Sequence, residues 1–462
     1  MNDSFIDILL LNSLRENSKT STPVQRASLN YAFILKNDFK IGNGDVVVSI
    51  LKPGTNWNAI EYSIFLNNSI HAPISLRDSL IDTIDKIIFL NPKLIITDSA
   101  TLKSSLEKKL SKSFSITTIS NLETNNSSTH NFNAIDFAST GVILNTSGTS
   151  HKPKYVFLSL ENMNVSFKEF ANSGIFNGVK SYLELLPYSF SGGRKVNYSA
   201  QLNNLDITYQ NRTKSLIENL KLSNADITAC VPYMLKEILT HLENNGNNLK
   251  IKKIISGGAP ITAKLIRIFD SHGIKIYNVY GLTETASLCS YNNDIYYKAN
   301  SVGKISRNIK FKINQNKELL LKGDNISKGY VVQTNPIKLK KITGFFNTKD
   351  IIEIDGEGFL YLKGRSDRSI KNSKGELVFI NHFEKILKEY FKIEILELRI
   401  YRNNLFIYSN LNHNLCDINA ITDKIYSFNL SIINAYLVHV NDLYEIPKGY
   451  DHKLNLNTFK II

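Results

Sequence analysis

The sequence predicts an α/β fold, with a large N-terminal domain of layered α/β sheets. Strand-like apolar runs alternate with helix-like stretches, which favours parallel sheets covered by helices. From Lys310 to Tyr361 the pattern changes to short strands with turn signals, which predicts a small β-subdomain. A compact α+β unit follows. We expect the chain to divide at Asp367, into a domain of residues 1–366 and a smaller one of residues 367–462.

The first part of the chain has the elements of a parallel sheet. Gly44 to Leu51, Gly-Asp-Val-Val-Val-Ser-Ile-Leu, is mostly apolar and predicts a buried strand, and Trp57 to Leu66 predicts a helix. Lys93 to Thr97 predicts a second strand. Ser104 to Asn133 is rich in Ser, Asn and Lys, so we expect a helix followed by a surface loop there.

The middle of the chain repeats this alternation. Tyr182 to Pro187, Ile227 to Val231 and Ile251 to Ile255 predict strands, and Tyr233 to Leu242 predicts a helix. The third of these strands runs into Ser256-Gly257-Gly258. Glycine-rich loops at the carboxyl ends of strands are where α/β sheets bind ligands.

The last hundred residues predict two helices and three strands. Leu398 to Tyr401 and Leu405 to Tyr408 flank a short polar turn, which is a hairpin signal. The helices are expected at Phe383 to Tyr390 and Ile418 to Phe428, and the third strand at Tyr436 to Val440. This is the pattern of a small α+β domain.

Composition excludes several classes of protein. With 462 residues, 42% apolar and 21% charged, the chain has the make-up of an ordinary soluble protein with more than one domain. The net charge is +14, but the lysines are scattered among acids, and no dense basic block with interleaved aromatic residues occurs. That distribution argues against nucleic acid as a partner. Abundant Asn, Lys, Ile and Ser fit an AT-rich bacterial genome.

The cysteines and the N-terminus indicate a cytoplasmic protein. Cys230, Cys289 and Cys416 are far apart, which argues for a reducing compartment and against a disulfide frame or a zinc site. The apolar stretch Phe5 to Leu14 contains Asp7 and lacks the basic start and small-residue cleavage site of a signal peptide. No run approaches 18 apolar residues, so we expect no transmembrane helix.

A polar loop at residues 145–155 has the composition of a phosphate-binding loop. It follows the apolar run Val142 to Leu144 and contains four hydroxyl side chains, Gly148, His151 and two lysines. Backbone N–H groups, hydroxyls and ammonium groups can together hold a phosphate chain. It is not a Walker A loop, because no Gly-Lys-Ser/Thr follows Gly148 at the required spacing. Taken alone, the stretch fits a polar turn between a strand and a helix equally well.

This loop resembles the phosphate loop of the adenylate-forming superfamily, which includes acyl-CoA ligases, luciferases and the adenylation domains of peptide synthetases. Four further stretches resemble motifs of that superfamily, and they occur in its order. They are Tyr280 to Glu284, Gly344 to Asp350, Gly364 to Asp367 with Ile370, Lys371 and Gly375, and Pro447 with Lys453. Weaker similarities are found at Ser256 to Pro260, Ser301 to Lys304 and Lys328 to Tyr330.

The resemblance implies ATP-dependent activation of a small carboxylic acid. A carboxylate is a poor acyl donor, and its attack on the α-phosphate of ATP gives an acyl-adenylate and pyrophosphate. The acyl group then passes to a thiol, either CoA or the phosphopantetheine of a carrier protein. The implied cofactors are ATP and Mg²⁺. Positioning and neutralisation of charge would supply most of the rate in such a reaction.

The resemblance also assigns the nucleotide-binding residues. The phosphate loop would hold the β- and γ-phosphates through Thr146, Ser147, Gly148, Thr149 and Lys154. The adenosine would be held by Gly257, Gly258, Ala259, Tyr280, Gly281, Asp350 and Arg365, with Tyr280 stacked on the adenine and Asp350 accepting the ribose hydroxyls. Thr283 would bond the α-phosphate, and Glu284 would hold Mg²⁺, which needs few protein carboxylates when phosphates supply the other oxygens.

Three assignments concern the small domain, which the resemblance implies is mobile. Lys453 is the expected catalytic lysine, bridging the substrate carboxylate and the α-phosphate. Asp367 is the expected hinge, because it lies at the boundary between the domains. Lys371 and Gly375 would line the channel by which the thiol enters, Gly375 leaving room for the pantetheine arm.

Four positions depart from the family pattern. His151, Tyr155, Lys349 and His452 stand where the superfamily usually has glycine. Side chains there restrict φ, so these changes leave open a degenerate homologue that binds nucleotide without turnover. Against that reading, the lysines, Glu284 and Asp350 are retained.

The acid is expected to lack an α-amino group. Amino-acid-activating domains carry an Asp in a Phe-Asp-x-Ser segment, where it pairs with the substrate ammonium. The matching stretch, Pro187 to Gly193, has no acidic residue, and a buried ammonium without a partner is costly. An aryl or aliphatic acid is therefore expected, in a pocket with the walls Phe190, Tyr233, Gly258 and Val279. A stand-alone amino-acid adenylation domain is the alternative.

Overall fold

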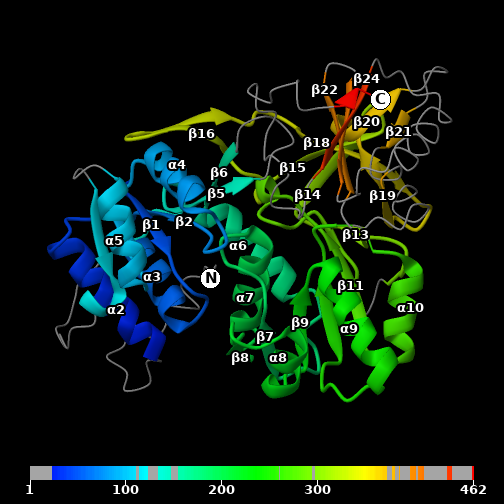
Figure 1. Ribbon diagram of the computed structural model, residues 1–462, viewed down its shortest axis with the longest axis horizontal. Helices are drawn as coiled ribbons and strands as arrows, with labels where there is room; N and C mark the ends of the chain where they lie inside the picture. Colours follow the sequence, from blue (N-terminus) through cyan, green and yellow to red (C-terminus); the bar gives the residue numbers. More distant parts are fainter. Residues whose placement is uncertain are drawn as a thin grey trace.

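The computed structural model describes most of the first 371 residues and parts of the remainder (Figure 1). The described residues are 23–110, 114–122, 134–146, 154–259, 261–293 and 297–371, followed by 377–379, 384, 396–401, 404–409, 434–439 and 460–461. Within this part of the chain, the layered α/β architecture expected from the sequence is confirmed. None of the described helices is long and apolar enough to cross a bilayer.

The first sheet has eight strands in the order β17-β16-β6-β5-β2-β1-β3-β4. The five strands from β5 to β4 are parallel, and the other three run antiparallel to their neighbours. Its strands are β1 (Val46–Ile50), β2 (Ile70–Pro73), β3 (Leu94–Thr97), β4 (Ser115–Thr118), β5 (Gly141–Thr146), β6 (Lys154–Ser159), β16 (Gly329–Thr334) and β17 (Ile337–Lys341). The helices of this part are α2 (Pro23–Asn37), α3 (Thr55–Leu66), α4 (Leu80–Leu90) and α5 (Ala100–Lys109).

The second sheet has seven strands in the order β13-β12-β11-β10-β9-β7-β8. The five from β11 to β8 are parallel, as the alternating pattern predicted. Its strands are β7 (Ser181–Glu184), β8 (Asp206–Tyr209), β9 (Ile227–Cys230), β10 (Lys253–Ser256), β11 (Lys275–Tyr280), β12 (Ser290–Tyr291) and β13 (Lys304–Ile305). The helices between them are α7 (Ser191–Leu202), α8 (Leu216–Ser223), α9 (Pro232–Asn245) and α10 (Ala263–Ser271).

Helices α6 (Leu160–Ala171) and α7 occupy the space between the two sheets (Figure 1). One buried core joins them to the first sheet, through Tyr62 and Phe65 of α3, Leu158 of β6, Phe167 of α6 and Tyr198 of α7. Helix α7 carries few apolar residues at its start, yet it is buried along most of its length. It therefore packs between layers on both sides and is not a surface helix.

The third sheet is antiparallel, with the order β14-β15-β18-β19. Its strands are β14 (Ile309–Ile313), β15 (Glu318–Gly323), β18 (Phe346–Ile354) and β19 (Leu360–Arg365). These strands cover the segment predicted as a β-subdomain and extend beyond it, to Ile309 at one end and Arg365 at the other. Strands β16 and β17 come from the same segment but join the first sheet, because Gly329 and Tyr330 pair with Phe157 and Val156 of β6. The sequence pattern of short apolar runs and turn residues predicted the strands, but it did not predict which sheet each strand joins.

The stretch from Ser104 to Asn133 differs in part from its prediction. Helix α5 begins earlier, at Ala100, and ends at Lys109, and β4 then pairs in parallel with β3. The strand Ser115–Thr118 consists of polar and β-branched residues at the sheet edge, so it lacked the apolar run that marks a buried strand.

Strands of the last hundred residues include the predicted hairpin. β22 (Leu396–Tyr401) and β23 (Asn404–Ser409) pair antiparallel, and β24 (Asn434–His439) lies parallel to β23. The remaining strands are β20 (Ser369–Lys371), β21 (Leu377–Phe379) and β25 (Lys460–Ile461). The helices expected at 383–390 and 418–428 lie outside the described residues apart from residue 384, and the domain boundary at Asp367 stays a prediction.

A buried charge network joins α3 to α7. The carboxylate of Glu61 accepts hydrogen bonds from Arg194 and Tyr198 of α7, and it lies 2.5 Å from Nδ1 of His71. All four side chains are almost wholly buried. Burial alone would raise the pKa of Glu61, but the charge of Arg194 and the bond to His71 outweigh it and lower the pKa to about 2. Ser49 continues the network, 2.6 Å from Nε2 of His71.

Glu61→Gln is expected to destabilise the fold by about 3 to 5 kcal/mol, because Arg194 would stay buried without its counter-charge. The pKa of Glu61 is depressed in the folded protein, so its stabilising effect is present above the unfolded value of 4.5 and is lost as the pH falls towards 2. The stability difference between wild type and variant should therefore shrink over that interval. Urea unfolding at several pH values measures this difference. Glu353→Gln, which breaks an exposed pair with Lys363, is the control and should change the free energy of unfolding far less, because solvent screens that pair. If Glu61→Gln and Glu353→Gln lowered the free energy of unfolding equally, the buried pair of Glu61 and Arg194 would not have the stabilising function assigned to it.

Lys349 lies in β18 with a left-handed φ of 65°, a conformation that favours glycine. Its half-exposed ammonium pairs with Glu318 at 3.5 Å, so loss of that pair should cost little. We therefore expect Lys349→Gly to be more stable than Lys349→Ala by about 1 kcal/mol, the cost of a Cβ in this region. Both variants lose the ion pair, so the comparison isolates the backbone. Thermal unfolding of the two variants measures the difference in stability. If Lys349→Ala is as stable as Lys349→Gly or more stable, the position carries no such strain.

Candidate functional site

A cavity of about 570 Å³ opens at the carboxyl ends of β7, β9, β10 and β11. In open α/β sheets this is the usual place for a ligand. Four residues predicted as acyl-pocket walls line it, namely Phe190, Tyr233, Gly258 and Val279. Phe190 begins α7 and Tyr233 lies in the first turn of α9, and both rings are more than half exposed. Large apolar side chains exposed at a cavity mouth are typical of a binding site.

The glycine-rich loop after β10 brings backbone against the cavity. A Cβ on Gly257 would lie 2.5 Å from the carbonyl oxygen of Val279, so only glycine fits between β10 and β11. Gly258 has a φ of +85° and also lines the cavity. Ala259 follows it and is exposed, but it is not among the lining residues. The loop thus leaves backbone N–H and C=O groups open to a ligand.

The loop after β11 is held in a fixed shape. Gly281 packs on Ser287, whose carbonyl oxygen would lie 2.2 Å from a Cβ at Gly281. Thr283 to Thr285 form a 3₁₀ turn, and Ala286 and Ser287 follow with positive φ values of 47° and 64°. Neighbouring segments bond its backbone, since Ser327 N–H donates to Glu284 O at 2.7 Å and Ser166 Oγ to Ala286 O at 2.8 Å. These bonds support a strained loop that carries three predicted site residues, Gly281, Thr283 and Glu284.

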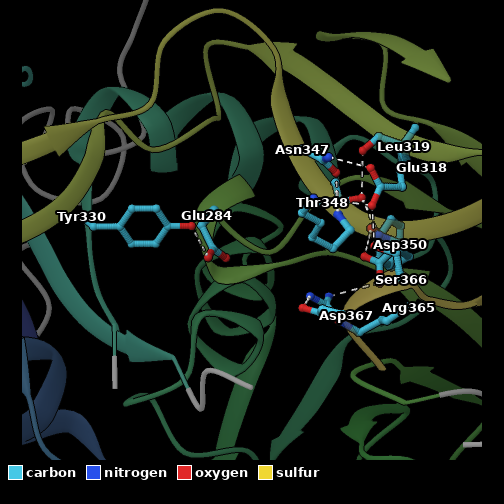
Figure 2. A network of polar contacts seen from close by, with 12 residues as sticks. Glu284, Glu318, Leu319, Tyr330, Asn347, Thr348, Asp350, Arg365, Ser366 and Asp367 are labelled. Atoms are coloured by element: carbon cyan, nitrogen blue, oxygen red, sulfur yellow. Dashed lines mark hydrogen bonds and ion pairs between the residues drawn. The ribbon is translucent and has the colours of Figure 1, made fainter. Parts of the chain in front are cut away.

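Glu284 is half-buried and faces Tyr330. The Tyr330 hydroxyl donates to Oε1 of Glu284 at 2.8 Å (Figure 2). Burial, reinforced by the carboxylate, raises the pKa of Tyr330. Among the described residues, no lysine or arginine forms an ion pair with Glu284. A carboxylate held by a neutral hydroxyl keeps its negative charge available for a cation.

Lys154 connects the predicted phosphate loop to this carboxylate. Strands β5 and β6 pair so that Thr146 lies opposite Lys154, and the ammonium of Lys154 is 5.5 Å from the centre of the Tyr330 ring. Tyr155 is buried and stacks on Phe89 of α4, with ring centres 4.1 Å apart. The residue that departs from glycine therefore serves the packing of the strand. Ser147, Gly148, Thr149 and His151 lie outside the described residues.

Asp350 is buried on β18, an inner strand of the third sheet, and binds two other predicted site residues. The Tyr280 hydroxyl donates to its Oδ2 at 2.5 Å. Nη1 of Arg365 donates to Oδ1 at 3.1 Å (Figure 2). Burial raises the pKa of Asp350, while Arg365 and the Tyr280 hydroxyl oppose that rise. The Tyr280 ring belongs to the core between the second and third sheets and is 7% exposed. Its predicted stacking on adenine stays a prediction.

Arg365 also binds the predicted hinge residue. Its Nε and Nη2 donate to the two carboxylate oxygens of Asp367, each at 2.8 Å (Figure 2). This is the bidentate geometry in which Arg and a carboxylate interact most strongly. One guanidinium therefore joins Asp350, the predicted ribose acceptor, to the start of the segment that leads to the small domain.

Glu318 is a buried carboxylate that sequence reasoning missed. Burial would raise its pKa, but hydrogen bonds from Ser366, Asn347 and Asn314 lower it to about 2. Figure 2 shows Glu318 beside Asn347 and Ser366, next to Asp350. It ties β15 to the turn that follows β19 and so supports the site without entering it. No motif distinguishes such a residue, since its function depends on pairing between strands.

The remaining predictions fall on the small domain. Lys371 ends strand β20, and Gly375, His452 and Lys453 lie outside the described residues. Their predicted functions stay predictions. Tyr330, in contrast, lay in the weak similarity at Lys328 to Tyr330 and could have been found there.

Comparison with known proteins identifies the family and the fold of the chain. The sequence profile of the AMP-binding enzyme family matches residues 12–331. A 2-succinylbenzoate–CoA ligase of Staphylococcus aureus (strain MSSA476) is 28% identical over 330 residues, which are 69% of this chain and 64% of that ligase. The matched region thus spans less than two thirds of the curated relative.

Two solved structures have the same fold. The o-succinylbenzoate CoA synthetase (MenE) of Bacillus subtilis, in complex with the acyl-adenylate OSB-AMP, aligns with a TM-score of 0.73 at 19% identity and covers 90% of this chain and 88% of its own. McyG A-PCP, complexed with phenylalanyl-adenylate, aligns with a TM-score of 0.72 at 18% identity and covers 88% and 72%. The profile match over more than half of the chain, together with this fold, shows that the protein belongs to the AMP-binding enzyme family.

Proposed function

We propose that the protein activates a carboxylic acid with ATP, forming an acyl-adenylate and pyrophosphate, and then transfers the acyl group to a thiol. One observation carries the proposal most directly. Residues from distant parts of the sequence, Glu284, Tyr330, Asp350 and Arg365, lie around the end of β11, where the 570 Å³ cavity begins at Gly281. A nucleotide held by these residues would thus lie next to an acid held in the cavity.

The described residues suit binding and charge neutralisation. Asp350 would accept ribose hydroxyls, held in place by Tyr280 and Arg365. Lys154 would neutralise phosphate charge from its place beside Tyr330. Thr283 lines the cavity and would bond the α-phosphate at the point of attack. Groups fixed before the reaction need no reorganisation while charge develops, which is how positioning lowers the barrier.

Mg²⁺ fits the residues present. The carboxylate of Glu284 has a neutral hydroxyl partner and lies near the end of β11, and no group of three or more His, Cys, Asp or Glu side chains among the described residues could form a closed metal site. A single carboxylate suits Mg²⁺, which takes its other oxygens from phosphates and water. When bound, the ion would neutralise phosphate charge.

The acid is proposed to be aryl or aliphatic and to lack an α-amino group. Ser189 and its neighbours in sequence provide no acidic side chain, and Glu237, the one acidic residue among the described residues that line the cavity, is exposed on α9. Because of the similar Staphylococcus aureus ligase, 2-succinylbenzoate is the first acid to test, with CoA as the first acceptor. A carrier protein is the other acceptor to test.

Pyrophosphate release with a panel of acids tests the proposal. The panel contains 2-succinylbenzoate, simple aryl acids, fatty acids and the standard amino acids. Release with aryl or aliphatic acids is the expected result. Release only with amino acids would favour an amino-acid adenylation domain, and no release with any acid would favour a degenerate homologue that binds nucleotide alone.

Glu284→Gln is expected to lower the rate of pyrophosphate release on the order of 100-fold, because it removes one group that compensates charge in the transition state. ATP should still bind, since the remaining contacts are kept. Tyr330→Phe removes the 2.8 Å hydrogen bond but keeps the carboxylate, so a much smaller loss is expected. Rates of pyrophosphate release measured over a range of Mg²⁺ concentrations distinguish loss of the carboxylate in Glu284→Gln from loss of the hydrogen bond in Tyr330→Phe. Full activity of Glu284→Gln at limiting Mg²⁺ would remove Glu284 from the metal site.

Two half-reactions are proposed to use two orientations of the small domain. Asp367→Pro fixes φ near about −65°, so we expect adenylate formation to survive and thioester formation to fail. Lys453→Ala should do the opposite, losing adenylation but still transferring acyl from a supplied acyl-adenylate. Asp367→Ala is the control, because it breaks the ion pair with Arg365 without restricting the backbone. An effect seen in Asp367→Pro but not in Asp367→Ala therefore comes from the fixed φ and not from the lost ion pair. If the Pro and Lys453 variants lose both half-reactions equally with the fold intact, or lose neither, the two-orientation mechanism is wrong.

A further inference from the structure

The wall of the cavity contains a buried lysine that the proposed reaction does not use. Lys195 lies in the second turn of α7, lines the cavity, and is 1% exposed. It is one of the largest fully buried side chains among the described residues. Lysine is almost never fully buried without a partner, so its presence here needs an explanation.

The groups in contact with the ammonium of Lys195 are uncharged. Nζ donates to the carbonyl oxygen of Ser287 at 2.8 Å and lies 4.0 Å from the centre of the Phe170 ring. Among the described residues, no carboxylate forms an ion pair with it. The neighbouring Arg194 contrasts with it, because that equally buried cation is bonded to Glu61. A buried charge without a counter-charge is costly. Arg194 is paired with Glu61, whereas Lys195 lies in the cavity wall with no carboxylate partner among the described residues.

The rest of the cavity wall supports an anionic ligand. Arg77 and Lys214 line it as well, and Glu237, the one acid among the described lining residues, is exposed to solvent, which screens its charge. The loop at Ser287 needs a hydrogen-bond donor, but a neutral side chain could supply one. The positive charge at Lys195 is therefore not accounted for by support of the loop.

We propose that Lys195 binds a second anionic group of the acid, distinct from the carboxylate that is activated. The substrate class is then a dicarboxylic acid, or an acid with an equivalent second anion. This inference rests on the proposed function for the identity of the cavity as the acid pocket. The second group is favoured over the reacting carboxylate because the reacting one loses its charge when the acyl-adenylate forms. A counter-ion that persists through the reaction keeps the buried ammonium paired.

Burial lowers the pKa of Lys195 to about 7. The Cys289 thiol beside it has a pKa raised by burial to about 12 and stays neutral, and Ser287 and Phe170 do not titrate in this range. Across the cavity, the charged groups of the described lining residues are Glu237, Arg77 and Lys214. A bound anion raises the pKa of Lys195, so a ligand that pairs with it is taken up together with a proton above pH 7.

Equilibrium titration of acids in the presence of AMP tests the inference without turnover. The ligands are 2-succinylbenzoate and aliphatic dicarboxylates, each with its monoamides, which keep the shape and remove one charge. For wild type we expect the best dicarboxylate to bind roughly tenfold or more tightly than a monoamide, as for a charge-assisted hydrogen bond. In Lys195→Met the two should bind within about threefold of each other, as in a double-mutant cycle.

Two further variants separate charge from support of the loop. Lys195→Gln can still donate to Ser287 but carries no charge, so it should lose the preference for the dicarboxylate. Lys195→Arg keeps the charge and should retain a preference. Calorimetry at pH 8 in buffers of different ionisation enthalpy should show uptake approaching about one proton by wild type and none by Lys195→Gln. A purely structural lysine would change neither the preference nor the proton uptake.

The inference is overturned if no dicarboxylate binds wild type more tightly than its monoamides, or if nothing binds. It is also overturned if Lys195→Gln weakens dicarboxylates and monocarboxylates equally, because Lys195 would then pair with the reacting group. Failure of the proposed function is a separate result. A preference that depends on Lys195, without pyrophosphate release from any acid, would leave the inference standing and remove the adenylation activity.

Discussion

The buried ion pair between Glu61 and Arg194 sets the relation of the two sheets. Glu61 belongs to α3, which packs on the first sheet, and Arg194 belongs to α7, which precedes β8 of the second sheet. His71 and Tyr198 supply the other hydrogen-bonding partners of the Glu61 carboxylate. Separating the two charges would leave each buried without its partner, so a displacement of α3 against α7 is costly. The next residue is Lys195, so the helix that carries this contact also carries the buried lysine of the cavity wall.

The parts of the fold predicted from sequence are those with a local signal. The apolar run at Val46–Ile50 and the glycine-rich turn after β10 are marked by their own residues, and the structure has both. The edge strand Ser115–Thr118 was missed because its residues are polar and only pairing with β3 makes it a strand. Likewise, β16 could be predicted as a strand but not as a neighbour of β6, since strand order is a long-range property.

In the candidate site, too, the residues that lie in motifs could be predicted, whereas the contacts between distant segments could not. Glu284, Asp350 and Arg365 lie in motifs, so their residue types and spacing are informative in the sequence alone. That Arg365 would bind Asp350 as well as its sequence neighbour Asp367 could not be predicted, because the contact with Asp350 depends on the register of β18 with β19. Lys195 has no motif at all. Its importance comes from burial without a carboxylate partner among the described residues, a property that only packing reveals.

The chain contains one tryptophan, and its position gives it a second use. Trp57 is buried where α3 meets α7, with the Arg194 guanidinium 4.7 Å from its ring and the Tyr188 ring centre 4.5 Å away. Tyr188 follows β7 and belongs to the approach to α7, so the indole touches both layers. Indole emission depends on nearby charge and solvent. The protein therefore carries an intrinsic optical reporter at the junction of its two sheets, and a shift in that junction on ligand binding is observable without any label.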